Sequence, residues 1–482
     1  MGETVLRPGF WPDHCKKIYS MKDIKNPLER PFENEISNLF FDQQISLVIV
    51  DDDPTGTQTA HDVPVLGYWS EDAFAHEFTI NTPLFFVLAN TRSLTKAKAT
   101  DRAMEIGKNL KIASEKTGRP FMFISRSDYT LRGYFPSEVE ALSQGAGLAH
   151  MPTLLIPAFF EGGRITEDNI HYILEAGIKI PVSETVFARD KSFGYVNADL
   201  TKWVEEKSGG KIKHEEVKSL TLEDIHHGEG AIFEKLKALK DNEVMVVNNT
   251  TYEELEKTCL VLHRLIKSGK LFNFRTAASF VSAFTGMGAL AWSPPQNSGY
   301  AGIGGLTIVG SYVDKSTSQL ENLLKKDGIK AIPLSVEQII GSEISNESLL
   351  KEIVQTIESC LTSGVNAVVY TSRKLVSGTN PEDSLAIGEK VTDFLVRMVS
   401  KLKTQPSFFI AKGGITSNDI AVNGLKMKRA IVLGQIIPGV PVWKLGDETM
   451  FPGMPYVVYP GNVGDAESLA RVFDLFTAKA ST

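Results

Sequence analysis

Short runs of consecutive apolar residues recur along this chain of 482 residues, and a longer amphipathic stretch separates most of them. A run without polar alternation is typical of a strand that is buried on both faces, as in a parallel sheet between two helical layers. The pattern therefore predicts an α/β fold with mainly parallel, Rossmann-like sheets. In the first half we expect strands at 47–50, 84–88, 121–125, 153–157 and 244–248, and helices near 98–117, 136–148, 167–177 and 251–268.

The pattern is interrupted at 293–305, which reads SPPQNSGYAGIGG and is typical of a linker or an ordered loop. It then resumes, with strands expected at 305–311, 366–372 and 408–414 and helices near 316–326, 346–363, 384–402 and 465–477. We therefore expect two α/β domains that follow an extension. The predicted boundaries are 1–43 for the N-terminal extension, 44–290 for the first domain and 291–482 for the second.

The charge balance favours small-molecule ligands. The net charge is -7, which argues against a nucleic-acid partner. No apolar run reaches the roughly 20 residues of a membrane helix, and the N-terminus lacks the apolar core of a secretory signal. Three widely spaced cysteines without a CxxC motif indicate neither a zinc site nor a disulfide framework. We expect a cytoplasmic protein with no membrane partner, and the oligomeric state stays open, a homo-oligomer included.

The stretch SLVIVDDDPTGTQT (46–59) ends an apolar run in three aspartates, although adjacent carboxylates repel one another. Three interpretations compete. Asp51-x-Asp53-x-Thr55 could hold the phosphoryl-accepting aspartate of a haloacid dehalogenase-like phosphatase, but neither GD pair of the chain, at 446–447 or 464–465, continues as GDxxxD. Alternatively, Asp52 and Asp53 with Thr55 could activate a substrate hydroxyl or hold a metal. The stretch could also be an acidic turn without chemistry.

Other predicted strands of the first half also end in polar turns. These turns contain Arg92 in NTRS (90–93), Asp128 and Arg132 in SRSDYTLRGY (125–134), and Arg164 in EGGR (161–164). The carboxyl ends of parallel strands meet at one edge of a sheet, and arginine binds carboxylates through two parallel hydrogen bonds. We therefore expect one acidic, hydroxylated ligand, bound by Thr55, Arg92, Asp128, Arg132 and Arg164.

The second half has glycine-rich turns where helices are predicted to begin. They are Gly310-Ser311, KGGITS (412–417) and GNVG (461–464). Exposed backbone N–H groups at a helix N-terminus bind phosphates, so these turns predict a nucleotide site, although the chain has no P-loop motif. The candidate residues are Ser311, Gly413, Gly414, Thr416, Ser417, Gly461, Asn462 and Gly464.

As a set, these motifs resemble the four-carbon acid sugar kinase family, formerly a family of unknown function. The resemblance spans about residues 46–476. The matching motifs are DDDPTGT (51–57), SDYTLRG (127–133), PAFFEGGR (157–164), VGSYVDKSTSQ (309–319), KGGITS (412–417), GQIIPGVPV (434–442) and PGNVGD (460–465).

The resemblance implies a kinase that transfers the γ-phosphoryl group of ATP to the terminal hydroxyl of a threonate, an erythronate or an oxo-tetronate. It places the catalytic base at Asp52 or Asp53, the sugar acid in the first domain and ATP in the second. Magnesium (Mg2+) is expected with ATP, because the transferring phosphate charge must be neutralised; its ligands stay unassigned. The alternatives that remain are the phosphatase above and a non-catalytic sensor of a sugar acid or nucleotide.

Overall fold

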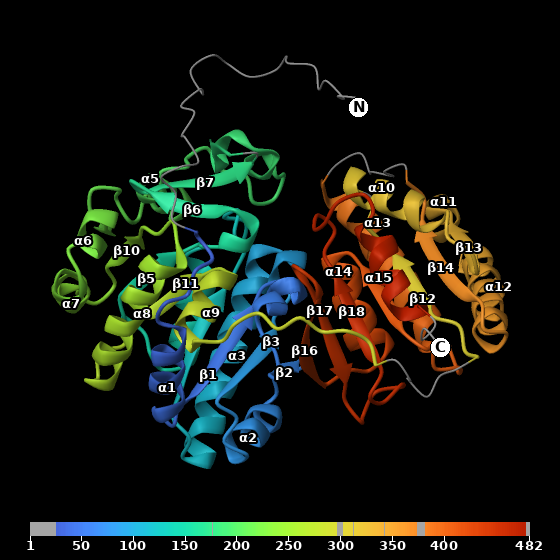
Figure 1. The fold of residues 1–482 in the computed structure, drawn as a ribbon, viewed down its shortest axis with the longest axis horizontal. Helices are drawn as coiled ribbons and strands as arrows, with labels where there is room; N and C mark the ends of the chain where they lie inside the picture. Colours follow the sequence, from blue (N-terminus) through green and yellow to red (C-terminus); the bar gives the residue numbers. More distant parts are fainter. Residues whose placement is uncertain are drawn as a thin grey trace.

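The computed structural model describes residues 26–175, 177–295, 302–311, 313–341, 343–373 and 381–478. Its main feature is one sheet that joins 15 strands of these residues and runs through both halves of the molecule (Figure 1). The strands lie in the order β13 (Ile329–Leu334), β14 (Asn366–Thr371), β12 (Leu306–Val309), β15 (Phe409–Lys412), β18 (Pro455–Tyr459), β17 (Val440–Leu445), β16 (Arg429–Ile437), β2 (Pro64–Leu66), β3 (Leu84–Leu88), β1 (Ser46–Asp51), β4 (Phe121–Arg126), β11 (Asn273–Thr276), β5 (Thr153–Ile156), β10 (Val244–Val247) and β9 (Lys218–Leu220).

Helices cover both faces of this sheet, as the absence of alternation in the apolar runs predicted (Figure 1). In β1, Leu47 and Ile49 pack into one hydrophobic cluster, whereas Val48 and Val50 pack into another. The α/β fold class is thus confirmed. The helices are α1 (Glu33–Asp42), α2 (Glu71–Thr79), α3 (Lys96–Thr117), α4 (Ser137–Gly145), α5 (Leu200–Lys207), α6 (Leu222–His226), α7 (Glu229–Ala238), α8 (Tyr252–Lys267), α9 (Ala278–Thr285), α10 (Asp314–Leu323), α11 (Val336–Ile339), α12 (Glu343–Thr362), α13 (Pro381–Ser400), α14 (Gly414–Asp419) and α15 (Ser468–Thr477).

The two halves are joined within the sheet. β2 of the first half pairs antiparallel with β16 of the second, and Val65 lies opposite Ala430. An ion pair reinforces this junction, because Nε of Arg429 lies 2.6 Å from Oε1 of the buried Glu77. The sequence pattern led us to expect separate sheets, and the short strand β2 that connects them was not predicted. The domain boundary near residue 290 stays a proposal.

The described part of the N-terminal extension is fastened to the first half; residues 1–25 of the extension lie outside the described residues. Helix α1 packs against α8 and α9. Just before it, Nε of Arg30 lies 2.8 Å from Oε1 of Glu256, and its Nη2 donates to the carbonyl oxygen of Ser282 over 3.0 Å. This segment is therefore part of the folded first half.

One predicted helix is wrong. Residues 167–177 lie mainly in a separate three-stranded antiparallel sheet of β6 (Arg164–Glu167), β7 (Ile170–Glu175) and β8 (Ile178–Pro181). Asp168 and Asn169, with φ of 50° and 64°, form the two-residue turn between β6 and β7. Aspartate and asparagine tolerate this left-handed conformation, so the hairpin signal was present in the sequence. The other predicted helices and strands form, with ends that differ by a few residues.

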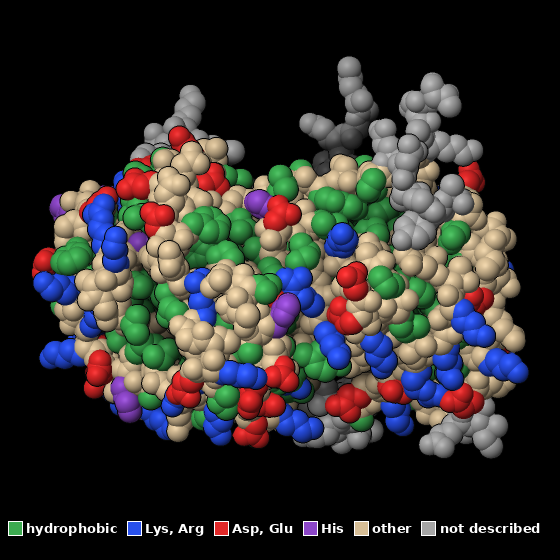
Figure 2. Space-filling model, turned by 90° about the horizontal axis from the view of Figure 1, so that it is seen from below, with side chains coloured by type: hydrophobic (Ala, Val, Ile, Leu, Met, Phe, Trp, Pro, Cys, Tyr) green, Lys and Arg blue, Asp and Glu red, His purple; other side chains and the backbone are tan. Residues whose placement is uncertain are grey.

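The surface carries charges of both signs. Figure 2 shows Lys and Arg intermixed with Asp and Glu over the face that it presents. In the described parts of the chain, no helix has both the length and the apolar character that crossing a membrane requires.

Gly56 generates a stability prediction. A Cβ atom at this position would overlap the carboxylate of Asp51, which is completely buried beneath it. We expect Gly56→Ala to lower the free energy of unfolding by about 2–3 kcal/mol, because overpacking at a buried site displaces backbone and side chains. Gly388→Ala is the matched control. Gly388 is exposed in α13, and an added Cβ there meets open space. The control should stabilise by up to about 1 kcal/mol. Denaturant unfolding of both variants measures the two effects, and equal stabilities would contradict the steric argument.

Candidate functional site

The first cluster of candidate residues lies where β1, β3 and β4 end. These strands are parallel, and Asp51 is in register with Leu88 on one side and with Arg126 on the other. The turns that follow them consequently start at the same edge of the sheet and bring Asp52, Asp53, Arg92 and Asp128 together.

Arg92 is the centre of this cluster. Its Nε lies 3.2 Å from Oδ1 of Asp52, its Nη2 lies 2.6 Å from Oδ2 of Asp53, and its Nη1 donates to Oδ1 of Asp128 over 3.2 Å. Asn90, at φ 46°, is left-handed and begins the turn that carries Arg92. Because three carboxylates share one guanidinium, their mutual repulsion is offset at the point where they are buried.

Asp51 lies in the interior of the protein and not at the surface of the cluster. It is completely buried, and its Oδ1 lies 3.3 Å from Nη1 of Arg126, which is itself buried. Burial raises the pKa of Asp51 to about 7, against the attraction of Arg126. A nucleophilic aspartate must reach its substrate, so the position of Asp51 beneath Gly56 argues against the phosphatase interpretation.

Asp53 is the most accessible of the three aspartates, with 17% of its side chain exposed, against 4% for Asp52. The backbone N–H of Thr55 donates to Oδ1 of Asp53 over 2.8 Å, and the Thr55 hydroxyl donates to the same atom. Burial acts to raise the pKa of Asp53, but Arg92 and Thr55 outweigh it and the pKa is lowered. Asp53 is thus an ionised carboxylate at the edge of the cluster. Thr55, predicted to bind substrate, is hydrogen-bonded to Asp53.

Arg132 is also engaged within the cluster. Its Nε donates to Oδ2 of Asp128 over 2.9 Å, and its Nη2 donates to Oδ1 over 3.2 Å. Burial acts to raise the pKa of Asp128, but Arg132 and Arg92 hold it well below its usual range. The guanidinium also lies 5.2 Å from the centre of the Phe187 ring. These contacts orient Arg132 and occupy one edge of its guanidinium.

Arg164 has unused donor capacity. Its guanidinium lies 4.9 Å from the centre of the Tyr129 ring, and its Nη1 donates to the carbonyl oxygen of Gly162. Its Nε is buried and makes no hydrogen bond to the residues that the structure describes. Tyr129 belongs to the turn that contains Asp128, so Arg164 lies next to the first cluster, without an ion pair to Asp52 or Asp53 among the described contacts.

The second cluster lies where β12, β15 and β18 end, in the other half of the sheet. A Cβ atom at Gly310 would overlap the side chain of Thr416, and one at Gly461 would lie 2.9 Å from Oγ of Ser311. Gly413, at φ 121°, adopts a conformation that favours glycine, and helix α14 follows it. The three glycine turns thus converge. The N-terminus of α14 begins at this point with N–H groups that have no partner inside the helix.

The predicted nucleotide residues do not all lie at this convergence. Ser417 is buried, and its hydroxyl lies 2.7 Å from the carbonyl oxygens of both Ala411 and Gly413. Asn462 is exposed, and Gly464 packs on Ser468 at the start of α15. The residues that the structure brings together are Ser311, Gly413, Gly414, Thr416 and Gly461.

The two clusters face each other across the junction of the halves. A Cβ atom at Gly414 would lie 2.8 Å from Oδ2 of Asp53. The 3-10 helix Pro54–Thr59 packs against α14 and β17, and the indole Nε1 of Trp443 donates to Oγ1 of Thr57 over 3.0 Å. Asp53 therefore lies at the N-terminus of α14, where the helix dipole favours an anion.

Sequence reasoning missed two basic residues. Arg275 is the third residue of β11 and lies beside the first cluster, where its Nη2 donates to the carbonyl oxygen of Arg132 over 3.3 Å. Burial lowers its pKa. Its signal was weak, because FNFRT (272–276) alternates apolar and polar residues and is not an apolar run like the other strands. Lys412 is buried at the end of β15, directly before Gly413, in a motif that we had used only for its glycines and hydroxyls.

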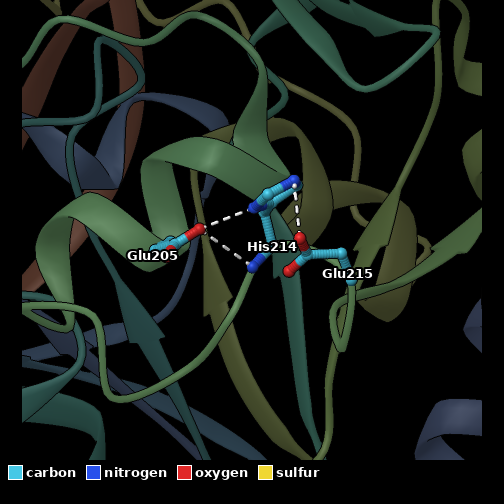
Figure 3. Close-up of side chains that lie close together, drawn as sticks. All are labelled: Glu205, His214 and Glu215. Carbon is cyan, nitrogen blue, oxygen red and sulfur yellow. Dashed lines mark hydrogen bonds and ion pairs between the residues drawn. The ribbon is translucent and has the colours of Figure 1, made fainter.

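Among the residues that the structure describes, neither cluster brings three possible metal-ligand atoms of His, Cys, Asp or Glu within 4.8 Å of one another. Among the described residues, one group of three, Glu205, His214 and Glu215, brings possible ligand atoms within 4.8 Å of one another (Figure 3). Nδ1 of His214 lies 2.6 Å from Oε2 of Glu205, which also pairs with Lys213. These partly exposed side chains are satisfied by their own ion pairs, so they do not indicate a cation.

Two family models match the chain, one in each half of the molecule. Residues 47–284 match the family model described as a sugar-binding N-terminal domain, and residues 306–469 match the one described as a nucleotide-binding C-terminal domain. No protein in the curated collection matches the chain. The residues of the first cluster lie within the first match, and those of the second cluster lie within the second.

Two solved structures share the fold. A protein from Salmonella typhimurium LT2, described as a candidate tRNA synthase, has a TM-score of 0.65 at 13% identity and covers 88% of this chain and 98% of its own. A Haemophilus influenzae protein of the family known as DUF1537 has a TM-score of 0.60 at 18% identity. The match covers 89% of this chain and 100% of the Haemophilus chain. A sugar-binding domain followed by a nucleotide-binding domain is the architecture of the four-carbon acid sugar kinases, and the chain belongs to that family.

Proposed function

We propose that the protein is an ATP-dependent kinase that phosphorylates the terminal hydroxyl of a four-carbon sugar acid, such as a threonate, an erythronate or an oxo-tetronate. The observation that carries this proposal is the position of Asp53 against Gly414. A carboxylate on the sugar-binding side thereby lies at the helix N-terminus of the nucleotide-binding side. A kinase needs this juxtaposition, because the acceptor hydroxyl and the γ-phosphoryl group must meet.

Asp53 is the proposed base. The substrate hydroxyl oxygen forms a bond to the γ-phosphorus, the bond from that phosphorus to the bridging oxygen of ADP breaks, and the hydroxyl proton passes to Asp53. Asp52 is less suited to this role, because only 4% of its side chain is exposed, against 17% for Asp53. Arg92 would hold both carboxylates in place during transfer.

Arg164 is the proposed ligand of the substrate carboxylate. Its Nε lacks a hydrogen bond to the described residues, whereas Arg92 and Arg132 are already paired with carboxylates. Magnesium would arrive with the phosphates of ATP and would neutralise their charge. This fits the first cluster, where the described carboxylates are paired with arginines and are not gathered around an empty cation site.

The decisive experiment is a panel of four-carbon acids assayed for ATP-dependent release of ADP. Release that requires one acid supports a kinase. A sensor would bind an acid or nucleotide without turnover. A phosphatase would hydrolyse phosphate esters without ATP and would form a phospho-enzyme, which the buried position of Asp51 disfavours.

The variant Asp53→Asn tests the base. Loss of the proton acceptor should lower kcat by roughly 10²- to 10⁴-fold. Binding of ATP should be retained or tightened, because a negative charge is removed beside Gly414. Steady-state kinetics and calorimetry with ATP measure the two effects. Asp62→Asn is the control, because Asp62 is exposed and its left-handed backbone suits asparagine. An ATP affinity that falls as far as the rate would contradict the assignment.

The pH dependence gives an independent test. Because the pKa of Asp53 is lowered, its carboxylate stays ionised until the pH falls through that lowered value. The acid limb of log kcat/KM for this base should therefore lie below the ordinary aspartate pKa of 3.8. A rate profile recorded over the pH range in which the protein stays folded measures this. An acid limb near neutral pH would show that another group is the base.

The variant Arg164→Lys tests recognition of the carboxylate. Lysine keeps the charge but loses the planar fork, so KM for the acid should rise roughly 10- to 150-fold, the equivalent of one charge-assisted hydrogen bond. KM for ATP should change little. An analogue whose carboxylate is replaced by an amide should lose much less. Equal losses for acid and amide would mean that Arg164 only holds its turn against Tyr129.

A further inference from the structure

Lys412 connects the three turns of the second cluster. Its carbonyl oxygen accepts the N–H groups of Gly310 and Ser311, over 3.1 and 3.3 Å. Its Nζ donates to the carbonyl oxygen of Pro460 over 3.0 Å, directly before Gly461. The turn after β15 is thereby tied to the turn after β12 by the backbone of Lys412 and to the turn after β18 by its side chain.

The ammonium group of Lys412 is buried, and the described part of the chain provides no counter-ion for it. In the described ranges, no carboxylate lies within ion-pair distance of it, and its Nζ lies 4.0 Å from the centre of the Tyr459 ring. Among the described residues, Lys315 of α10 acts on its charge and the ring of Tyr459 of β18 lies against it, whereas Arg373, which follows β14, donates to the carbonyl oxygen of Ser311 in the neighbouring turn. Lys315 and Arg373 are cations, and burial raises the pKa of Tyr459 well above its usual range, so the tyrosine is neutral.

This arrangement is unfavourable by itself. A buried cation that lacks a partner costs several kcal/mol, and proteins reduce that cost by releasing the proton. Burial, with a smaller contribution from Lys315, lowers the pKa of Lys412 to about 7. The charge becomes favourable once an anion enters the glycine turns, because a nearby negative charge stabilises the protonated form.

We propose that Lys412 is a positioning residue of the nucleotide site that holds the three glycine turns in register and takes up a proton from solvent when the nucleotide's phosphates bind. The proposal rests on the function proposed above and extends it to a residue beneath the turns. Lys412 acts through Pro460 and Ser311 and through its charge, since its side chain is buried below the surface of the turns.

Calorimetry of the whole chain with MgADP tests this proposal. Titrations at pH 8 in two buffers of different ionisation enthalpy measure the protons taken up. At pH 8 the phosphates are fully ionised, because phosphate monoesters lose their second proton near pH 6. We expect uptake of a large part of one proton at pH 8. At pH 6 this uptake should disappear, because Lys412 is then already charged in the free protein.

The variant Lys412→Met should lose the uptake at pH 8 and bind MgADP roughly 10- to 150-fold more weakly, while KM for the sugar acid stays unchanged. Lys444→Met is the matched control. Lys444 is exposed on β17, and the variant Lys444→Met should keep both the proton uptake and the affinity for MgADP. If Lys412→Met does not fold, the titrations of the unmodified protein still decide. Binding of MgADP without uptake overturns this inference alone, as does uptake that persists in Lys412→Met. Absence of any nucleotide binding overturns the proposed function and this inference with it.

Discussion

The organisation of the site depends on the ion pairs between one arginine and three carboxylates. Asp52, Asp53 and Asp128 lie on turns that parallel strands bring to one edge, and without Arg92 their repulsion would oppose burial there. Arg126 likewise offsets the charge of Asp51, and both of these side chains are buried in the interior. These contacts leave Asp53 at the surface of the cluster, ionised and facing the second half. The chemistry proposed for Asp53 is thus a consequence of how the acidic strand end is neutralised.

The continuous sheet sets the distance between the two clusters. The pairing of β2 with β16 and the 3-10 helix Pro54–Thr59 place the acidic strand end beside helix α14. Gly414, which follows the glycine of the turn after β15, therefore has Asp53 as its neighbour. A side chain at this position would disturb the proposed base as well as the proposed phosphate site. A variant of Gly414 cannot separate nucleotide binding from catalysis, and Lys412 is the better probe of the nucleotide side.

Much of the fold was predictable, because a strand that is buried on both faces of a sheet has apolar residues at consecutive positions. Runs such as LVIV and LFFVL are apolar at every position, and both are strands. Two features could not be predicted from runs of apolar residues. The segment around Ile170 carries an apolar pattern that suited a helix as well as the strand it forms, and the turn residues Asp168 and Asn169 decided the outcome. The strand β2 has three residues, too few for any periodicity to identify.

The sequence by itself determined which chemical groups end the strands: aspartates and arginines in the first half, glycines and hydroxyls in the second. It also carried the motifs of the four-carbon acid sugar kinases. Only the tertiary structure decided which of these groups face a ligand. Asp51 and Asp53 are two residues apart, yet one is buried beneath Gly56 and the other lies against Gly414. Lys412 and Arg275 acquire their importance from neighbours distant in the chain. Exposure and electrostatic environment depend on such long-range contacts, which a local pattern of residues does not encode.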